Sequence, residues 1–307
     1  MLKTSILILL LFFAITPAQG QSLSKAEDYF KRSKAQLERG NIEQAFSDIN
    51  SAINLNQNFA AAFLLRAIIL EKKGQLDGVL ADYSKFIELE PDAPGVEVIY
   101  NNRSMLRLSK GDMDGALEDI NKAILLKPRF AEAYNGRAII RLQKEDFEGA
   151  LSDFDKSIEL KPTLPSAFMG RGSCLYRKGN LQRALGDFNK AIELKKDYAD
   201  AYVNRGVVRG LTGDLDGALL DLRNGVALDP RSVSDESRGH FISPFKNLNQ
   251  FIFGHPANAR AYQILGVFRL LQGKENEAEQ SFNRSIKINS QLKPEINRII
   301  KEIKQPK

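Results

Sequence analysis

A thirty-four-residue repeat constrains the fold of this chain more than any other sequence feature. Three copies follow one another without a gap, over residues 131–164, 165–198 and 199–232. Each copy contains two apolar-periodic runs of about a dozen residues, which is a helical length. Self-similarity at this period is typical of a stacked helical array, in which each unit buries one face against its neighbour.

The repeat continues beyond this core in both directions. We identify seven copies, whose predicted boundaries are 26–59, 60–93, 97–130, 131–164, 165–198, 199–232 and 259–292. A short insertion precedes the third copy, and a long insertion, residues 233–258, precedes the seventh. Residues 293–305 follow the last copy with isoleucines on a single stripe, so we predict a capping helix there.

The columns of this internal alignment indicate how the helices pack. Position four of each copy is aromatic, position eight is small, position twenty is alanine or valine, and position twenty-four is large. Small residues let two antiparallel helices approach to about 8–10 Å. Glycine marks the turn between the helices in six copies, and Glu145 replaces it in the fourth. The predicted N-caps of the second helix are Asn41, Asp112, Asp146, Asn180 and Asp214.

These columns resemble the tetratricopeptide repeat family. The aromatic-x-x-x-small spacing, the alanine at position twenty and the proline at position thirty-two are marks of that family, and they cover residues 26–292 except the long insertion. The resemblance implies an all-α, right-handed α-solenoid of antiparallel helix pairs with a C-terminal capping helix. It also implies a non-enzymatic scaffold that binds another protein and needs no cofactor.

In proteins of that family, side chains at five positions of the first helix line a concave groove. The corresponding side chains here are unusually aliphatic, and an exposed surface of this kind favours binding of a peptide or helix from a partner. The candidate groove residues are Met105, Leu108, Ile139, Leu142, Met169, Ser173, Tyr176 and Val207. The alternative is a groove that is narrow or filled by the chain itself.

Arginine at position seven and aspartate at position twenty-three occur together in six copies and are both missing from the seventh. We therefore predict that they pair, within a copy or between neighbours, as a ladder that fixes the stack. The best-defined rungs use Arg103, Asp119, Arg137, Asp153, Arg171, Asp187, Arg205 and Asp221. The alternative is a basic stripe that binds a polyanion.

The long insertion is the least regular part of the chain. It holds four phenylalanines and both histidines, His240 and His255, and residues 244–253 are predicted to form an extra helix. This helix is either a packed elaboration, or a lid or plug over the groove, or a docking helix. An enzyme or accessory subunit with its activity in residues 233–258 is the alternative function.

No catalytic motif is evident, so we expect no enzyme activity and no metal or cofactor. Two histidines fifteen residues apart are poor metal ligands, and Cys174 falls in an apolar column where a thiol is inert. Most aromatic side chains fall in core columns, which argues against nucleic-acid stacking. The partner's identity and the oligomeric state do not follow from the sequence.

Residues 1–20 differ from the repeats. Lys3 is followed by the apolar run 6–15, which is too short to span a bilayer, and Ala18 and Gly20 form a small-residue cleavage site. We predict a secretory signal peptide and a periplasmic or secreted protein without stable membrane insertion after cleavage. An uncleaved membrane anchor is the alternative.

Overall fold

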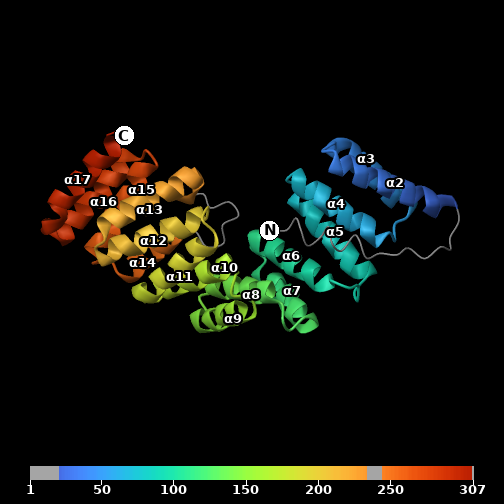
Figure 1. Ribbon diagram of the computed structural model, residues 1–307, viewed down its shortest axis with the longest axis horizontal. Coiled ribbons are helices and arrows are strands. Elements are labelled where there is room, and N and C mark those ends of the chain that lie inside the picture. The colour runs from blue at the N-terminus through green and yellow to red at the C-terminus, as the bar shows by residue number, and fades with distance from the viewer. Residues whose placement is uncertain (1–20, 234–243, 306–307) are drawn as a thin grey trace. The chain divides into compact units, whose positions relative to one another are not determined.

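The computed structural model describes residues 21–233 and 244–305, with side chains from Ser24 onward. The predicted signal peptide and the first part of the insertion, with His240, lie outside the described residues. The described residues form sixteen α-helices and two short 3-10 helices, and they contain no strand (Figure 1). No helix among them is both long enough and apolar enough to cross a bilayer.

The helices group into two compact units, divided after Gly136. The helices of the N-terminal unit are α2 (Gln21–Glu38), α3 (Ile42–Leu55), α4 (Ala60–Lys72), α5 (Leu76–Leu89), α6 (Val96–Ser109) and α7 (Met113–Leu126), followed by the start of α8 (Ala131–Gln143). Within this unit α2 packs on α3, α4 on α5 and α6 on α7, and each pair contacts the next (Figure 1). Tyr83, Phe86 and Leu64 lie at the centre of one of its hydrophobic clusters.

The C-terminal unit continues the same arrangement to the end of the chain. Its elements after α8 are α9 (Phe147–Leu160), α10 (Pro165–Arg177), α11 (Leu181–Leu194), α12 (Ala199–Thr212), α13 (Leu215–Leu228), η1 (Pro230–Val233), α14 (Pro244–Gly254), α15 (Ala259–Leu271), α16 (Glu275–Ile288), η2 (Ser290–Leu292) and α17 (Lys293–Lys304). Helix α17 lies where a capping helix is expected and packs on α15. The predicted extra helix of the insertion is present as α14.

The turn between the two helices of a pair requires a left-handed backbone. Gly40, Gly74 and Gly111 adopt φ angles of 80°, 72° and 83° there, and the later turn glycines behave alike. Glu145 takes the same conformation with φ 62°, and it is the one non-glycine residue of positive φ in the described chain. An L-residue in this region costs free energy that glycine avoids.

Side chains cap the second helix in most of the pairs that were predicted to have one. The Oδ1 atoms of Asp112, Asp146 and Asp214 accept the backbone N–H three residues onward at 2.9, 2.9 and 3.0 Å. Asn180 makes the same bond at 3.4 Å. Asn41 also occupies the N-cap position of its helix, but its side chain makes no capping bond and donates instead to a glutamine of the preceding helix.

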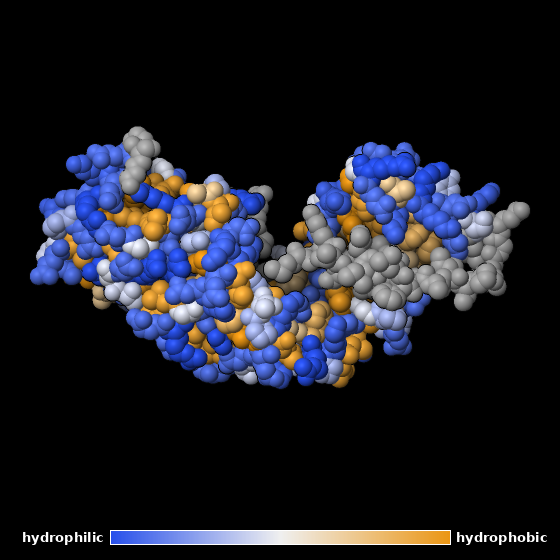
Figure 2. Space-filling view, viewed as in Figure 1, coloured by the Kyte–Doolittle hydropathy of each residue, from blue (hydrophilic) through white to orange (hydrophobic). Residues whose placement is uncertain are grey.

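Small and large columns meet as the alignment predicts. A Cβ added to Gly172 would lie 2.8 Å from Cε1 of Phe188, and one added to Gly266 would lie 2.4 Å from Cε1 of Phe282. Each glycine therefore makes room for the aromatic ring of its own repeat. The all-α solenoid of antiparallel helix pairs is confirmed. In Figure 2 hydrophilic side chains cover much of each unit, and apolar atoms show between them.

Candidate functional site

The first helices of the N-terminal unit carry a row of partly exposed apolar side chains. Phe30 of α2, Ile68 of α4, and Val98 and Met105 of α6 are all neither buried nor fully exposed. Val98 is at position two of its repeat, Phe30 at position five, and Ile68 and Met105 at position nine. Positions two, five and nine are three and four residues apart, so they fall on one face of the helix. This row is the part of the predicted groove that remains accessible in the N-terminal unit.

Three asparagines lie near this row, and two of them have an unpaired amide oxygen. Asn101 Oδ1 and Asn135 Oδ1 are buried without a hydrogen-bond partner. The side chain of Asn102 interacts with the buried hydroxyl of Tyr83 and accepts a weak bond from Asn101 at 3.4 Å. A Cβ added to Gly136 would lie 3.2 Å from Cε of Met105 and 3.5 Å from Asn101 Oδ1, so both side chains lie against the backbone of α8. We call Asn101, Asn102 and Asn135 the asparagine cluster.

The asparagine cluster is not among the site residues predicted from the sequence. The sequence feature that could have indicated it is position five of the repeat, which is asparagine in two successive copies, at Asn101 and Asn135. Buried polar atoms are nearly always paired in native proteins, so the unpaired Oδ1 atoms of Asn101 and Asn135 mark a place where a ligand or water is needed.

The predicted groove residues are less accessible than expected. Met105 is half-buried, and the other seven are buried: Leu108, Ile139, Leu142, Met169, Ser173, Tyr176 and Val207. The expectation of an exposed aliphatic lining is therefore wrong for these seven side chains. In the C-terminal unit an additional helix packs on three of the first helices.

That additional helix is α14. It packs on α10, α12 and α15, which are the first helices of the fifth, sixth and seventh repeats (Figure 1). Phe251 of α14 stacks on Tyr176 with ring centroids 5.3 Å apart, and Asn247 donates to Asn204 Oδ1 at 3.2 Å. These contacts are expected both of a packed elaboration and of a plug in the groove of this unit.

Each arginine of the ladder meets the aspartate of its own repeat. The Nε and Nη2 atoms of Arg205 lie 2.8 and 2.7 Å from the two carboxylate oxygens of Asp221. The other rungs have the same two-pronged geometry at 2.6–2.8 Å: Arg103 with Asp119, Arg137 with Asp153, and Arg171 with Asp187. The aspartates are buried, so a paired arginine is needed to keep them charged.

Several of these arginines also reach the preceding repeat. Arg103 Nη1 donates to Ser84 at 3.1 Å, Arg171 Nη1 to Asp155 at 2.7 Å, and Arg205 Nη1 to Asn189 at 2.9 Å. The acceptor is position twenty-five of the previous copy in each case. A single guanidinium therefore joins both helices of its own repeat and the repeat before it.

A second arginine shares the same carboxylate in three repeats. The Nη1 atom of Arg141 lies 2.7 Å from Asp153 Oδ2, and that of Arg209 lies 2.8 Å from Asp221 Oδ2. The corresponding distance from Arg107 Nη1 to Asp119 Oδ2 is 3.2 Å. The arginines of these rungs face acidic side chains and do not form a free basic stripe. This arrangement weakens the polyanion alternative.

The described residues hold no group of three side chains suited to bind a metal ion. Burial raises the pKa of the Cys174 thiol to about 12 and so disfavours the reactive thiolate. The ring of His255 stacks on that of Phe251 with centroids 4.3 Å apart, and His255 Nδ1 lies 3.0 Å from the carbonyl oxygen of Phe251. These contacts place His255 in packing around α14.

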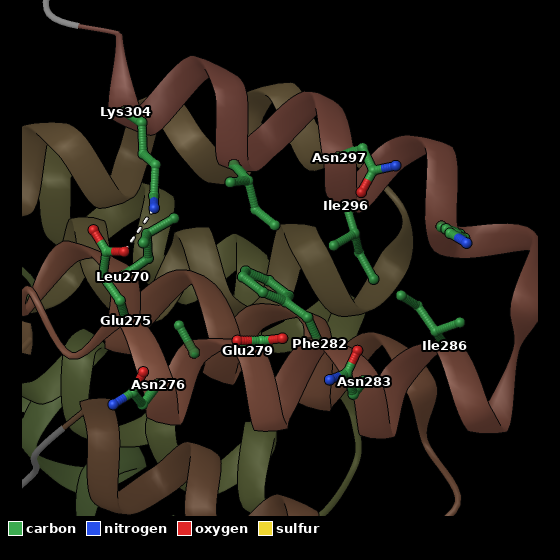
Figure 3. A pocket seen from close by; sticks show the side chains of 13 residues that line it. Leu270, Glu275, Asn276, Glu279, Phe282, Asn283, Ile286, Ile296, Asn297 and Lys304 are labelled. Atoms are coloured by element: carbon green, nitrogen blue, oxygen red, sulfur yellow. Dashed lines mark hydrogen bonds and ion pairs between the residues drawn. The ribbon is translucent and has the colours of Figure 1, made fainter.

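A cavity of about 350 Å³ lies between α16 and α17 (Figure 3). Phe282, Leu270 and Ile296 form its apolar wall, and Lys304 closes one end through an ion pair with Glu275 at 2.7 Å. The lining combines one apolar wall with dispersed amides and charges. It resembles the unfilled space beside the last repeat of a stack and contains no nucleophile with an adjacent base.

Comparison with protein families identifies the repeat. Models described as tetratricopeptide repeat or TPR repeat match residues 102–165, 172–213 and 259–292.

Solved structures of such proteins share the fold. A tetratricopeptide repeat protein from Parabacteroides merdae aligns over 93% of this chain and 100% of its own, at 20% identity and a TM-score of 0.60. PilF of Pseudomonas aeruginosa aligns over 69% of this chain and 95% of its own, at 18% identity and a TM-score of 0.55. MamA of Desulfovibrio magneticus, from residue 41 onward, aligns over 59% of this chain and 99% of its own, at 20% identity and a TM-score of 0.52.

Proposed function

Because this chain belongs to the tetratricopeptide repeat family, we propose that it is a non-enzymatic scaffold that binds a peptide segment of another protein. The binding surface is the inner face of the N-terminal unit, formed by the partly exposed row and the asparagine cluster. The described residues of the C-terminal unit offer no equivalent open surface on α10, α12 and α15, because α14 packs on these helices.

The unpaired amides of the asparagine cluster carry this proposal. Asn135 is only 9% exposed and Asn101 Oδ1 is also buried, so leaving the two amide oxygens unpaired costs free energy. A peptide main chain offers N–H donors and C=O acceptors at regular spacing, and an asparagine amide can pair with both. The adjacent Met105 and Val98 would contact the side chains of the same peptide.

Peptide selection on the full chain tests this function. Peptides of twelve random residues are selected by display, and the dissociation constant of the best binder is measured by fluorescence anisotropy. Asn101→Ala and Asn135→Ala should each weaken binding roughly 2- to 10-fold, as expected for one lost hydrogen bond. Met105→Glu should weaken binding further, because it places a charge on the apolar contact surface.

The matched control is Leu125→Glu, since Leu125 is 71% exposed on α7, a second helix of its pair. The control should bind like the natural chain. Equal affinity in all four variants would refute the proposed surface. Charges at Ile139 and Leu142 are unsuitable probes, because these side chains are 9% and 2% exposed and an unpaired buried charge would unfold the repeat.

The place of action is proposed separately from the binding surface. The basic start, apolar run and small-residue cleavage site within residues 1–20 support export to the periplasm or the cell exterior. Protein purified from its own cells should be found outside the cytoplasm with Gln21 as its first residue. A cytoplasmic protein that retains Met1 would contradict export.

A further inference from the structure

We propose that the groove of the C-terminal unit is a receptor for an amphipathic helix, and that α14 is its internal occupant, displaced when a partner presents a helix with the same face. This site is separate from the asparagine cluster, so the two proposals can fail independently. The partner helix is defined by chemistry: aromatic anchors at both ends, with an asparagine and a leucine between them.

The face that α14 turns to the groove defines the recognised pattern. Its buried side chains are Pro244, Phe245, Asn247, Leu248 and Phe251. Asn247, Leu248 and Phe251 follow Pro244 by three, four and seven residues, which is one face of a helix, and Phe245 lies at the edge of that face. The opposite face is exposed, and Phe253 is 89% accessible. Helix α14 therefore binds as a separate amphipathic helix does, through one stripe.

The groove receives this stripe through matching chemistry. Phe251 stacks on Tyr176, and the ring centroids of Phe245 and Phe268 are 6.1 Å apart. Between these anchors Asn247 donates to Asn204, which is completely buried. The two aromatic contacts set the length of the recognised helix, and the amide pair sets its register.

Two helices that α14 contacts carry buried polar atoms without a partner. The hydroxyl of Tyr176 is buried without a partner, and both amide atoms of the fully buried Gln263 are also unpaired. Gln263 lies on α15, one of the helices on which α14 packs. A partner helix with a polar side chain opposite Gln263 would make bonds that α14 does not make, so it can compete with a tethered occupant.

The repeats contact one another without α14. Helix α15 packs directly on α12, and a Cβ added to Gly210 would lie 2.1 Å from Cδ1 of Ile264. Release of α14 therefore leaves the sixth and seventh repeats joined. A helix of eleven residues is unstable alone in water, so the released segment would unfold and its return would require refolding on the groove.

A labelled synthetic peptide of residues 244–256 tests the proposal in the full-length protein. In the natural chain the tethered α14 competes with the peptide, so binding should be weak. In a double variant, Leu248→Ala with Phe251→Ala, the internal helix loses two anchors, and the peptide should bind at least tenfold tighter in fluorescence anisotropy. Phe253→Ala, on the exposed face, should behave like the natural chain.

Two results would overturn the proposal. Equal peptide affinity in the natural chain and the double variant would show that the peptide does not bind the groove that α14 fills. Loss of hydrogen-exchange protection throughout α12 and α15 in the double variant would show that α14 is a permanent part of the core. Retained protection in both helices, with protection lost in α14 alone and tighter peptide binding, supports a displaceable occupant.

Discussion

The rung between Arg205 and Asp221 allows a quantitative test of what holds the repeats together. The carboxylate of Asp221 is 1% exposed, and it accepts two bonds from Arg205 and one from Arg209 at 2.8 Å. The seventh repeat carries Leu265 and Ser281 at the two ladder positions. The chain therefore supplies its own replacement pair, which can be placed in the sixth repeat as Arg205→Leu and Asp221→Ser.

The single change Arg205→Leu leaves Asp221 with one cationic partner. Removing one member of a buried pair costs about 3–5 kcal/mol in unfolding free energy. Arg209 offsets part of this loss, whereas the broken bond from Arg205 to Asn189 adds about 0.5–1.5 kcal/mol. We expect Arg205→Leu to destabilise the protein by roughly 3 kcal/mol, near the lower end of the range for a buried pair.

The double change removes the buried charge together with its partner, so it should cost only about 1 kcal/mol. Adding Asp221→Ser to Arg205→Leu should therefore restore about 2 kcal/mol of unfolding free energy. Urea unfolding followed by far-UV circular dichroism measures these differences. Hydrogen exchange in α12 and α13 locates them, because repeat arrays can depart from two-state unfolding. Equal destabilisation by the single and double variants would refute the reasoning.

Three further changes test local features of the fold. Glu145→Gly should be about 1 kcal/mol more stable than Glu145→Ala in urea unfolding. Both variants lose the bond to Arg177, but only alanine has a side chain that is strained at a φ of 62°. Equal stabilities of the two variants would argue against a left-handed backbone at this position. Gly170→Ala should cost about 1–3 kcal/mol in the same assay, since its Cβ would lie 2.3 Å from Cε1 of Phe154, and an unchanged midpoint would contradict this packing. Cys174 should resist Ellman's reagent at pH 8 until the protein unfolds, because burial raises its thiol pKa to about 12, and rapid labelling of the folded protein would contradict its burial.

Much of the architecture could be predicted because the sequence repeats itself. Seven aligned copies compare the same position seven times, so the packing of small against large residues followed from the columns alone. The partners of the arginine ladder followed from their joint loss in the seventh repeat. What the columns left open was whether each pair joins one repeat or two. The structure answers through Arg171, whose guanidinium meets Asp187 of its own repeat and Asp155 of the previous one.

The groove of the C-terminal unit could not be predicted in the same way, because a segment that does not repeat packs on it. Tyr176 occupies a groove position in the alignment, yet it is completely buried in a unit where α14 fills the groove. The sequence of α14 predicted a helix with an apolar face but not the surface against which that face packs. The asparagine cluster depends on the approach of α6 to α8, and a column alignment does not contain distances.

Site-specific photo-crosslinking in the cells that make this protein tests the proposed binding surface most directly. A photoreactive amino acid is placed at Met105, beside the asparagine cluster, or at Leu125, which is 71% exposed on α7. We expect a discrete protein adduct at position 105 that disappears when Asn101→Ala and Asn135→Ala are added, and no such adduct at position 125. Equal adducts at the two positions, or an adduct at 105 that persists without both asparagines, would contradict it.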